Sequence, residues 1–363
     1  MTETLSRTEP AAPAAPSVSV IVCAYTEQRW ADICAGMAAL RAQTVAPSEV
    51  LLVVDHADDL LLRARETFPW VRVVPNTGLR GLSAARNTGV AEARGNILAF
   101  VDDDAVPARD WLEHLVEPYA DPDVVAVGGS ASPAWPVERP GWFPPEFDWV
   151  VGCSYRGLPT SRSEIRNLMG CNMSFRAEVL AADAGFRVGV GRVGLNPLGC
   201  EETELCIRIR QRRPEARIIF EPGAAVHHRV TPERTRWNYF VARCFAEGKS
   251  KATVATHVGA DDALELERSY CLRTLPTGVL AGMRAASRGE YAGLARAAAI
   301  MAGLTVTAAG YGAAAVQRGS SRRTGVCPEV DPTDAYEAAL TGDRVSARAG
   351  RRSWPAPRRR DTV

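Results

Sequence analysis

The chain has 363 residues, of which 46% are hydrophobic and 23% are charged, and its formal net charge is +1. This length allows one large domain with a substantial extension, and the composition is that of a folded protein rather than a disordered one. The near-zero net charge gives no sign of a nucleic-acid partner.

Nine cysteines are scattered along the chain without a CxxC or other metal-ligand spacing, and their number is odd. We therefore expect reduced, mostly buried thiols and a cytoplasmic protein. Residues 1–16 are rich in Thr, Glu, Ala and Pro and contain no apolar run of the signal-peptide type, so they are expected to form a disordered leader.

From Val18 onward, strand-like apolar runs alternate with helix-like segments. The expected strands are residues 18–23, 50–55, 71–74 and 97–101, and the expected helices between them are residues 28–42, 60–68 and 82–94. A further helix is expected near residues 111–119. Such alternation predicts an α/β fold, with a mostly parallel sheet flanked by helices.

The segments that follow are less regular. Residues 133–163 combine several prolines with large aromatic side chains, which either line a cleft or pack as a small separate core: Trp135, Trp142, Phe143, Phe147 and Trp149. Residues 185–199 are rich in Gly and predict a mobile loop. A short strand at 217–220 and a helix over 233–255 are expected next.

The C-terminal part has a different composition. Residues 297–316 are uncharged and apolar or small, and their length just suffices to span a bilayer, although Ala and Gly insert weakly. Upstream, arginines alternate with apolar residues over 268–288, which fits either a helix on an anionic membrane surface or a helical pair packed on the main domain. Residues 319–363 are expected to form a disordered, Arg-rich tail.

Three carboxylates, Asp102, Asp103 and Asp104, directly follow the buried strand at 97–101. In open α/β sheets, ligands bind at this end of the strands. Adjacent like charges repel one another unless a cation neutralises them. We therefore expect either a divalent cation that holds a diphosphate or a polar turn that precedes the next helix.

Several motifs occur in an order that is typical of one enzyme family. They are Cys23-Ala-Tyr-Thr-Glu27, Val53-Val-Asp55, the segment from Gly81 to Gly89, the Asp triplet, and the segments Gly170 to Arg176, Gly199 to Arg208 and Pro222 to Arg229. This series resembles glycosyltransferase family 2, the inverting sugar transferases with a GT-A (Rossmann-like) fold. The resemblance covers residues 18–243.

The resemblance implies specific roles for residues of this chain. The implied nucleotide-sugar-binding residues are Tyr25, Glu27, Asp55, Arg86, Asp102, Asp103, Asn172 and Glu201. Glu202 takes the position of the catalytic base, while Asp104 and His228 take those of the ligands of a Mg²⁺ or Mn²⁺ ion. A carboxylate at position 55 can accept the imide N–H of uracil, which favours a UDP-sugar donor, although His56 replaces the usual second acid.

Structural interpretations of these residues stay open. Tyr25 is also explained as a core aromatic, Asn172 as a buried amide bonded to backbone, and Arg86 as a partner of either a phosphate or the acidic cluster. Acids in a first helical turn are favoured by the helix dipole, which accounts for any one of the acids at 201–204. Two adjacent histidines on a strand point to opposite faces, so one of His227 and His228 is expected to face the cleft.

The predicted protein is thus a metal-dependent inverting glycosyltransferase that moves a sugar from a nucleotide sugar to a hydroxyl acceptor, such as a lipid-linked or cell-envelope glycan. Residues 17–245 are expected to form the GT-A domain. Residues 246–318 are expected to form a helical extension that contacts the inner face of the cell membrane peripherally.

Two alternatives remain, a nucleotidyltransferase on a related fold and a non-catalytic protein that binds membranes or nucleic acid through its Arg-rich end. The Lys-containing phosphate loop of the former is missing near the first strand. Nothing in the folded region resembles a nucleic-acid module, so no nucleic-acid partner is expected. An NAD-dependent enzyme is disfavoured because no GxGxxG follows the first strand.

Overall fold

The computed structural model describes residues 16–192 and 198–324. Most of the expected leader, residues 193–197 of the expected Gly-rich loop and the tail beyond residue 324 lie outside the described residues. The cysteines that are described are all free, and most of them are buried, as expected.

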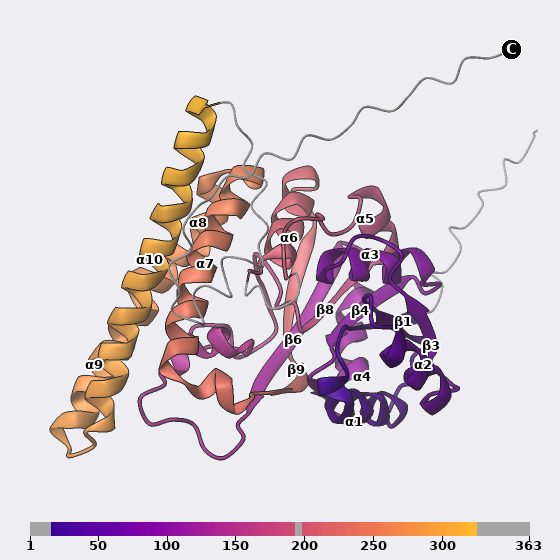
Figure 1. The fold of residues 1–363 in the computed structure, drawn as a ribbon, viewed down its shortest axis with the longest axis horizontal. Coiled ribbons are helices and arrows are strands. Elements are labelled where there is room, and N and C mark those ends of the chain that lie inside the picture. Colours follow the sequence, from indigo (N-terminus) through magenta and orange to yellow (C-terminus); the bar gives the residue numbers. More distant parts are fainter. Residues whose placement is uncertain (1–15, 193–197, 325–363) are drawn as a thin grey trace, which may run out of the picture.

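A nine-stranded sheet forms the centre of the molecule (Figure 1). In spatial order its strands are β3 (Arg72–Pro75), β2 (Glu49–Val54), β1 (Val18–Ala24), β4 (Ile97–Asp102), β8 (Asn172–Arg176), β6 (Val124–Ala134), β9 (Arg217–Arg229) and β5 (Ala105–Pro107), and β7 (Ser163–Glu164) pairs with β9. The strands from β3 to β4 are parallel, whereas β8 runs antiparallel to both of its neighbours. The sheet is therefore mixed, and its parallel half is the part in which strands and helices alternate along the sequence.

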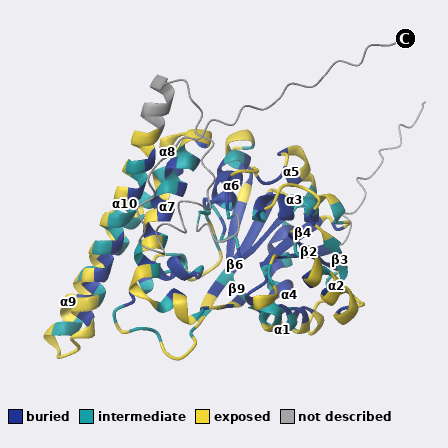
Figure 2. Ribbon diagram, in the orientation of Figure 1, coloured by how far each residue is buried: buried dark blue, intermediate teal, exposed yellow. Residues whose placement is uncertain are grey.

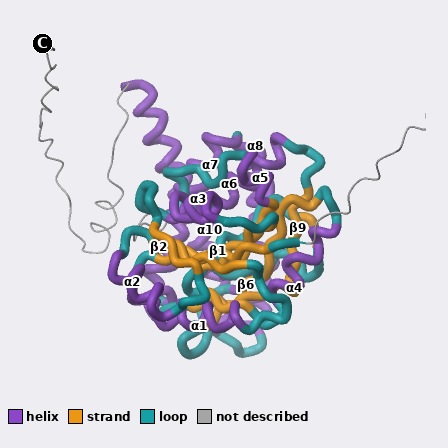
Figure 3. The backbone as a smooth tube through the Cα atoms, turned by 90° about the vertical axis from the view of Figure 1, so that its right-hand side faces the viewer, coloured by secondary structure: helices purple, strands orange, loops and turns teal. Residues whose placement is uncertain are grey.

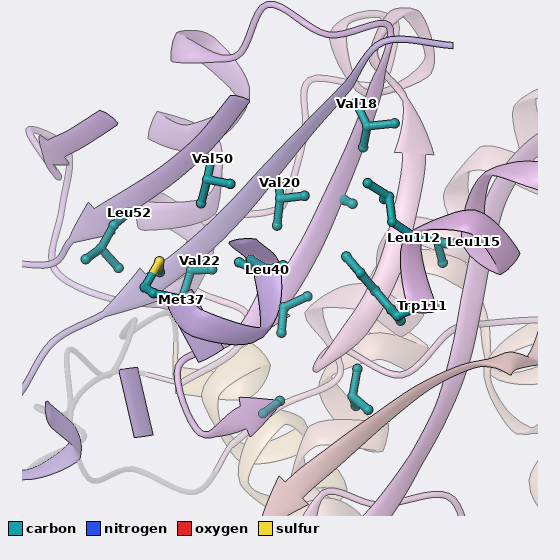
Figure 4. Close-up of a cluster of buried hydrophobic side chains, with 14 of the residues drawn as sticks. Val18, Val20, Val22, Met37, Leu40, Val50, Leu52, Trp111, Leu112 and Leu115 are labelled. Atoms are coloured by element: carbon teal, nitrogen blue, oxygen red, sulfur yellow. The ribbon is translucent and has the colours of Figure 1, made fainter. Parts of the chain in front are cut away.

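Helices cover both faces of this sheet, which forms the middle layer in Figure 3. One face carries α1 (Trp30–Arg41), α2 (Asp58–Thr67) and α4 (Trp111–Val116), and the other carries α3 (Leu82–Glu92), α5 (Ala177–Ala182) and α6 (Glu201–Arg212). Alternation along β1 places Val20 and Val22 in the first core with Met37, shown in Figure 4, and Ile21 in the second core. Burial on both faces explains the continuous apolar runs of the central strands.

The expected elements of the first hundred residues are confirmed, with ends that differ by one or a few residues. The helix expected at 28–42 begins as a short 3-10 turn, η1 (Glu27–Arg29), before α1. The strand expected at 217–220 is longer, because β9 continues to Arg229 and pairs along most of its length with β6. Short 3-10 turns also occur at η2 (Glu117–Ala120), η3 (Pro145–Val151) and η4 (Pro232–Thr235).

A second helical layer lies beside the sheet domain (Figure 1). It consists of α7 (Trp237–Val258), α8 (Ala260–Ser269), a π-helical turn η5 (Tyr270–Thr274), α9 (Leu275–Ser287) and α10 (Ala292–Thr324). The boundary expected after residue 245 falls inside α7, and α10 continues past residue 319, where disorder was expected. Helix α10 packs against α7 and α9, so the helical-pair interpretation of this region describes the structure.

Glycines allow these helices to approach closely. A Cβ atom on Gly248 of α7 would overlap the carbonyl oxygen of Thr307 in α10, and one on Gly310 would overlap the carbonyl oxygen of Phe245. The Ala- and Gly-rich composition of α10 thus serves helix packing. Residues Ala292–Gln317 are also long and apolar enough to cross a membrane by length and composition, with 28% of the relevant window buried.

The aromatic residues of 133–163 fulfil both roles that the sequence left open. Phe143 and Phe147 are fully buried and pack with Phe240 of α7 in a separate hydrophobic core. Phe147 and Trp149 also line the large cavity described below. This core therefore joins the sheet domain to the helical layer, and one side of it forms a wall of the cavity.

Candidate functional site

A cavity of about 530 Å³ opens at the carboxyl edge of the parallel strands. Tyr25 follows β1, Asp55 follows β2 and Asp102 ends β4, and all three line the cavity. The parallel register places Cys23 of β1 beside Asp102, so the polar residues that follow these strands share one edge of the sheet. This edge is where the sequence predicted a ligand site.

Asp102, Asp104 and His228 form a cluster at this edge. Each offers one ligand atom, and these atoms lie within 4.8 Å of one another. The antiparallel pairing of β5 with β9 sets Ala105 opposite His228, which brings His228 Nε2 to 3.1 Å from Asp104 Oδ1. His227 points to the other face, is exposed, and lies 3.0 Å from Ser132 Oγ, as strand alternation predicted.

Two arginines that the sequence analysis missed also contact this cluster. Arg29 pairs with Asp103 and lies 3.2 Å from Asp104 Oδ2, and Arg234 Nη2 lies 3.2 Å from the same oxygen. Burial acts to raise the pKa of Asp104, but His228, Arg29 and Arg234 together hold it well below its usual value. No local pattern marked these arginines, because they come from segments about two hundred residues apart in the chain.

Asp103 differs from its neighbour. Burial raises the pKa of Asp103 to about 7, although the charge of Arg29 acts in the opposite direction. Its Oδ2 atom is buried without a hydrogen-bond partner among the described residues, and so is His228 Nδ1. A donor set of carboxylate oxygens and one imidazole nitrogen suits Mg²⁺ or Mn²⁺, so these residues fit a divalent cation.

Arg86 links the acids of two separate segments. Its guanidinium donates to Glu201 Oε1 at 2.6 Å, to Asp102 Oδ1 at 3.2 Å and to the Gly170 carbonyl at 2.8 Å. The side chain is almost completely buried in α3. Of the two roles considered for Arg86, the structure shows the pairing with the acidic cluster, which ties the first turn of α6 to the end of β4.

The first turn of α6 brings Glu201 and Glu202 to the cavity wall. Glu201 pairs with Arg86 and keeps its Oε2 atom without a hydrogen-bond partner in the described part of the chain. Burial, with the charge of Glu201, raises the pKa of Glu202 to about 8. A carboxyl group with such a pKa can exchange a proton near neutral pH, which is what a general base requires.

Asp55 and Tyr25 also line the cavity. The Asp55 carboxylate accepts hydrogen bonds from Asn76 Nδ2 at 2.6 Å and from the Gly81 amide at 2.9 Å, which fix its orientation. Tyr25 is 39% exposed, and the guanidinium of Arg29 lies 5.5 Å from the centre of its ring. An exposed aromatic ring beside an oriented carboxylate offers a surface for a planar base.

Three predicted site residues are not among those that line the cavity: Glu27, Asn172 and Asp104, of which Asp104 contacts the lining residue His228. Glu27 is exposed in η1 and lies 3.5 Å from Arg63. Asn172 is fully buried, accepts a hydrogen bond from Trp111 Nε1 at 2.8 Å, and donates to the carbonyls of Ser130 and Ala224 at 2.8 Å each. The structure thus supports the backbone-bonded interpretation of Asn172, which connects the middle strands of the sheet rather than contacting a sugar.

Comparisons with known proteins agree with this fold. The fold is similar to that of a solved mannosyltransferase from Pyrobaculum calidifontis, with a TM-score of 0.51 and 20% identity over 81% of this chain and 88% of that chain. The sheet, its flanking helices and the acidic edge therefore define a GT-A protein. Residues 19–182 match the family model described as Glycosyl transferase family 2.

Curated relatives extend the match further along the chain. Over 238 residues the chain is 37% identical to glucosyl-dolichyl phosphate glucuronosyltransferase of Haloferax volcanii, which covers 64% of this chain and 76% of the relative. It is 25% identical to succinoglycan biosynthesis protein ExoM of Rhizobium meliloti, over 64% of this chain and 73% of the relative. The chain belongs to glycosyltransferase family 2, which confirms the resemblance inferred from its motifs, and it is an enzyme of the glycosyltransferase class.

Proposed function

We propose that this glycosyltransferase transfers a sugar from a UDP-sugar to a hydroxyl acceptor in a metal-dependent single displacement that inverts the anomeric configuration. The observation that carries the proposal is the meeting of Asp102, Asp104 and His228 at one edge of the cavity whose wall includes Glu202. One part of the cavity can therefore hold a diphosphate while another accepts a proton.

The donor end of the cavity is assigned to the nucleotide. Asp55 is held by two hydrogen-bond donors and keeps further lone pairs for the imide N–H of uracil, and Tyr25 offers its ring to the base. Asp102, Asp104 and His228 would hold the divalent cation, which when bound neutralises charge on the departing diphosphate. Arg86 positions Asp102 and Glu201 through the bonds described above.

Glu202 is assigned the role of the base. Its raised pKa keeps the carboxyl close to the proton-exchange range, and it lies at the N-terminus of α6 beside the paired Glu201. In the proposed reaction, Glu202 takes the proton of the acceptor hydroxyl as the acceptor oxygen bonds to the anomeric carbon and the bond to the diphosphate breaks. The acceptor attacks from the face opposite the leaving group, so the configuration inverts.

A lipid-linked acceptor and a location at the inner face of the cell membrane complete the proposal. The Haloferax volcanii relative is named for glucosyl-dolichyl phosphate, and α10 has the length and composition of a membrane-seeking helix. The proposed organisation is a catalytic sheet domain followed by a helical, membrane-associated region that begins with α7 rather than at the expected residue 246.

The first test measures thermal shift and sugar transfer with UDP-, GDP- and TDP-sugars, with and without Mn²⁺. We expect a shift for UDP-sugars that requires the metal, and its loss in Asp104→Ala. Glu202→Gln is expected to bind the donor normally and to lose most transfer, by about 10²-fold or more. Full transfer activity in either variant, or an equal shift for all three nucleotides, would contradict these assignments.

A further inference from the structure

The cavity extends well beyond the ends of the strands. Its far half, which we call the helix-side chamber, is formed by side chains of the C-terminal helices together with Trp149, Tyr155 and Arg166 of the preceding loops. The family model ends at residue 182, before these helices begin. Most of the chamber is therefore formed by residues beyond the segment that the family model matches.

A chain of buried charges runs through the helix-side chamber. Arg243 Nη1 lies 2.9 Å from Glu247 Oε2, and Lys251 Nζ lies 3.6 Å from Glu247 Oε1. Lys251 Nζ also lies 2.7 Å from Glu267 Oε1, and Arg166 Nη1 lies 2.8 Å from Glu267 Oε2. The side chains of Arg243, Lys251 and Arg166 are 11%, 14% and 4% exposed, so these charges are largely removed from water.

Positive charge is in excess in this chamber. Among its described residues, Arg166, Arg243 and Lys251 are matched by two acids only, and Arg192 also lines the cavity. Arg243 Nε is buried without a hydrogen-bond partner in the described part of the chain. Because an unbalanced buried charge is costly, the chamber is suited to an anion.

Tyr239 of α7 supports this charge balance. Burial acts to raise the pKa of its phenol, yet the pKa is lowered, because Arg234, Arg192 and Arg243 lie near it. The positive charge of these arginines, with Arg234 contributing most, thus outweighs burial at Tyr239. A phosphate group matches the fork of Arg243 and the ammonium of Lys251.

An apolar wall adjoins these cations. It comes from α8, η5, α9 and α10 and consists of Leu264, Leu266, Cys271, Leu275, Leu304 and Ala308. The π-helical turn η5 interrupts the helix between α8 and α9 at this wall, and π-turns are frequent at functional sites. A ligand that spans the chamber therefore meets cations at one end and an apolar surface beside them.

We propose that the helix-side chamber is the acceptor subsite and that it binds a phosphate-bearing amphiphile, with the phosphate against Arg243 and Lys251 and the alkyl chain along the apolar wall. This assignment rests on the proposed function, because it takes Glu202 as the base. Cys200, the residue before α6, lies with its Sγ 3.2 Å from Glu247 Oε1, so the base and the buried charges adjoin. The acceptor hydroxyl is thus close to the phosphate of the same molecule.

The chain offers a matched pair of residues for the test, because its lysines are only Lys249 and Lys251 and both lie in α7. Lys251 lines the cavity and Lys249 is not among the lining residues. The full chain, labelled with ε-¹³C-lysine, is titrated with n-dodecyl phosphate below its micelle concentration. We expect the Lys251 signal to shift saturably and the Lys249 signal to stay in place.

Further probes and variants distinguish the contribution of the phosphate to binding from that of the alkyl chain. Inorganic phosphate and n-dodecyl maltoside, which lacks the anion, are each expected to bind about tenfold or more weaker than n-dodecyl phosphate. In calorimetry, Lys251→Met and Arg243→Gln are expected to weaken binding by about 10- to 100-fold, while Lys249→Met leaves it unchanged. Ala308→Trp retains every charge but fills the chamber, so we expect it to abolish binding. It tests the chamber independently should a charge variant fail to fold.

Equal binding of the maltoside, equal shifts of both lysine signals, or full affinity in Arg243→Gln and Ala308→Trp would overturn the subsite. Binding of UDP with Mn²⁺ is measured on the same samples. If the donor binds and n-dodecyl phosphate does not, this inference fails and the proposed function stands. If n-dodecyl phosphate binds as described but no nucleotide sugar supports transfer, the proposed function fails and an anionic amphiphile site remains.

Discussion

Glu202 is a carboxyl group whose surroundings favour its protonated form. Its pKa of about 8 lies above the usual Glu value, so the folded protein retains a proton that the unfolded chain has already lost. The stability contributed by this proton is present at low pH and is lost as the pH rises through about 8. As the pH rises, the free energy of unfolding of the metal-free wild-type protein should therefore fall relative to that of Glu202→Gln.

This difference is measured by urea unfolding of both proteins. Between about pH 7 and about pH 9, wild type should lose about 1 kcal/mol relative to Glu202→Gln, because over part of this interval the folded protein still holds a proton that the unfolded chain has lost. Glu202→Gln is the control for wild type, because the amide of Gln does not titrate in this pH range. Parallel curves for the two proteins would show that Glu202 is already ionised at neutral pH.

Arg86 is the cation on which two acids of the site depend. Replacing it by Met leaves Glu201 buried without a positive partner, which is expected to cost about 3–5 kcal/mol. The double variant Arg86→Met with Glu201→Met removes both charges and should recover much of this loss. Equilibrium unfolding in urea completes the double-mutant cycle, and additive losses would mean that the two side chains do not interact.

At the scale of elements, two glycines of the C-terminal helices distinguish the effect of close helix packing from the effect of helix propensity. Gly248→Ala puts a Cβ against the backbone of α10 and should destabilise the protein by about 1–3 kcal/mol. Gly312, also in α10, has no heavy atom within 4 Å of its ideal Cβ. Gly312→Ala should therefore stabilise the protein by about 0.5–1 kcal/mol, because Ala is the better helix former. Thermal unfolding of both variants checks the opposite signs.

Sequence patterns predicted the elements with local signals and missed those that depend on distant partners. The strands at whose ends Asp55 and Asp102 lie were expected from their apolar runs, and their parallel register brought the two acids to one edge. Asn172 was predicted as a site residue because its motif matched the family. Its side-chain amide instead donates hydrogen bonds to the carbonyls of Ser130 and Ala224, and no local sequence pattern indicates these partners. Arg29 was missed for the same reason, since its role depends on contact with the acid cluster.

The whole molecule combines the sheet domain with the helical layer, and the cavity lies between them. The sequence indicated both parts but gave no sign of a shared cavity, because its far wall depends on how α8 and α10 lie against loops from the first half of the chain. The family model covers the strands that form the acidic edge of the sheet. The helix-side chamber combines Trp149, Tyr155 and Arg166 of the matched segment with helices beyond it.

The outward side of α9 and α10 is largely exposed (Figure 2) and carries apolar and basic side chains. Leu280, Met283 and Leu294 are each more than half exposed, and the basic residues over 275–317 outnumber the single acid, Glu290. Such a surface is expected to bind anionic membranes through both charge and apolar contact. The full chain should therefore sediment with phosphatidylglycerol-containing vesicles, and less so with pure phosphatidylcholine vesicles.

Matched variants can distinguish the effect of the protein's net charge on vesicle binding from the effect of basic residues on this particular face. Joint replacement of Arg284 and Arg288 by Gln should weaken vesicle binding by roughly fivefold per residue, because each basic residue near an anionic surface contributes about 1 kcal/mol. The control replaces Arg41 and Arg109, which lie at α1 and before α4, away from α9 and α10 (Figure 1). An equal loss in the control would mean that net charge, and not this face, drives binding. Binding to neutral vesicles as strong as to anionic ones would exclude the arginines as determinants and leave apolar contact to explain the association.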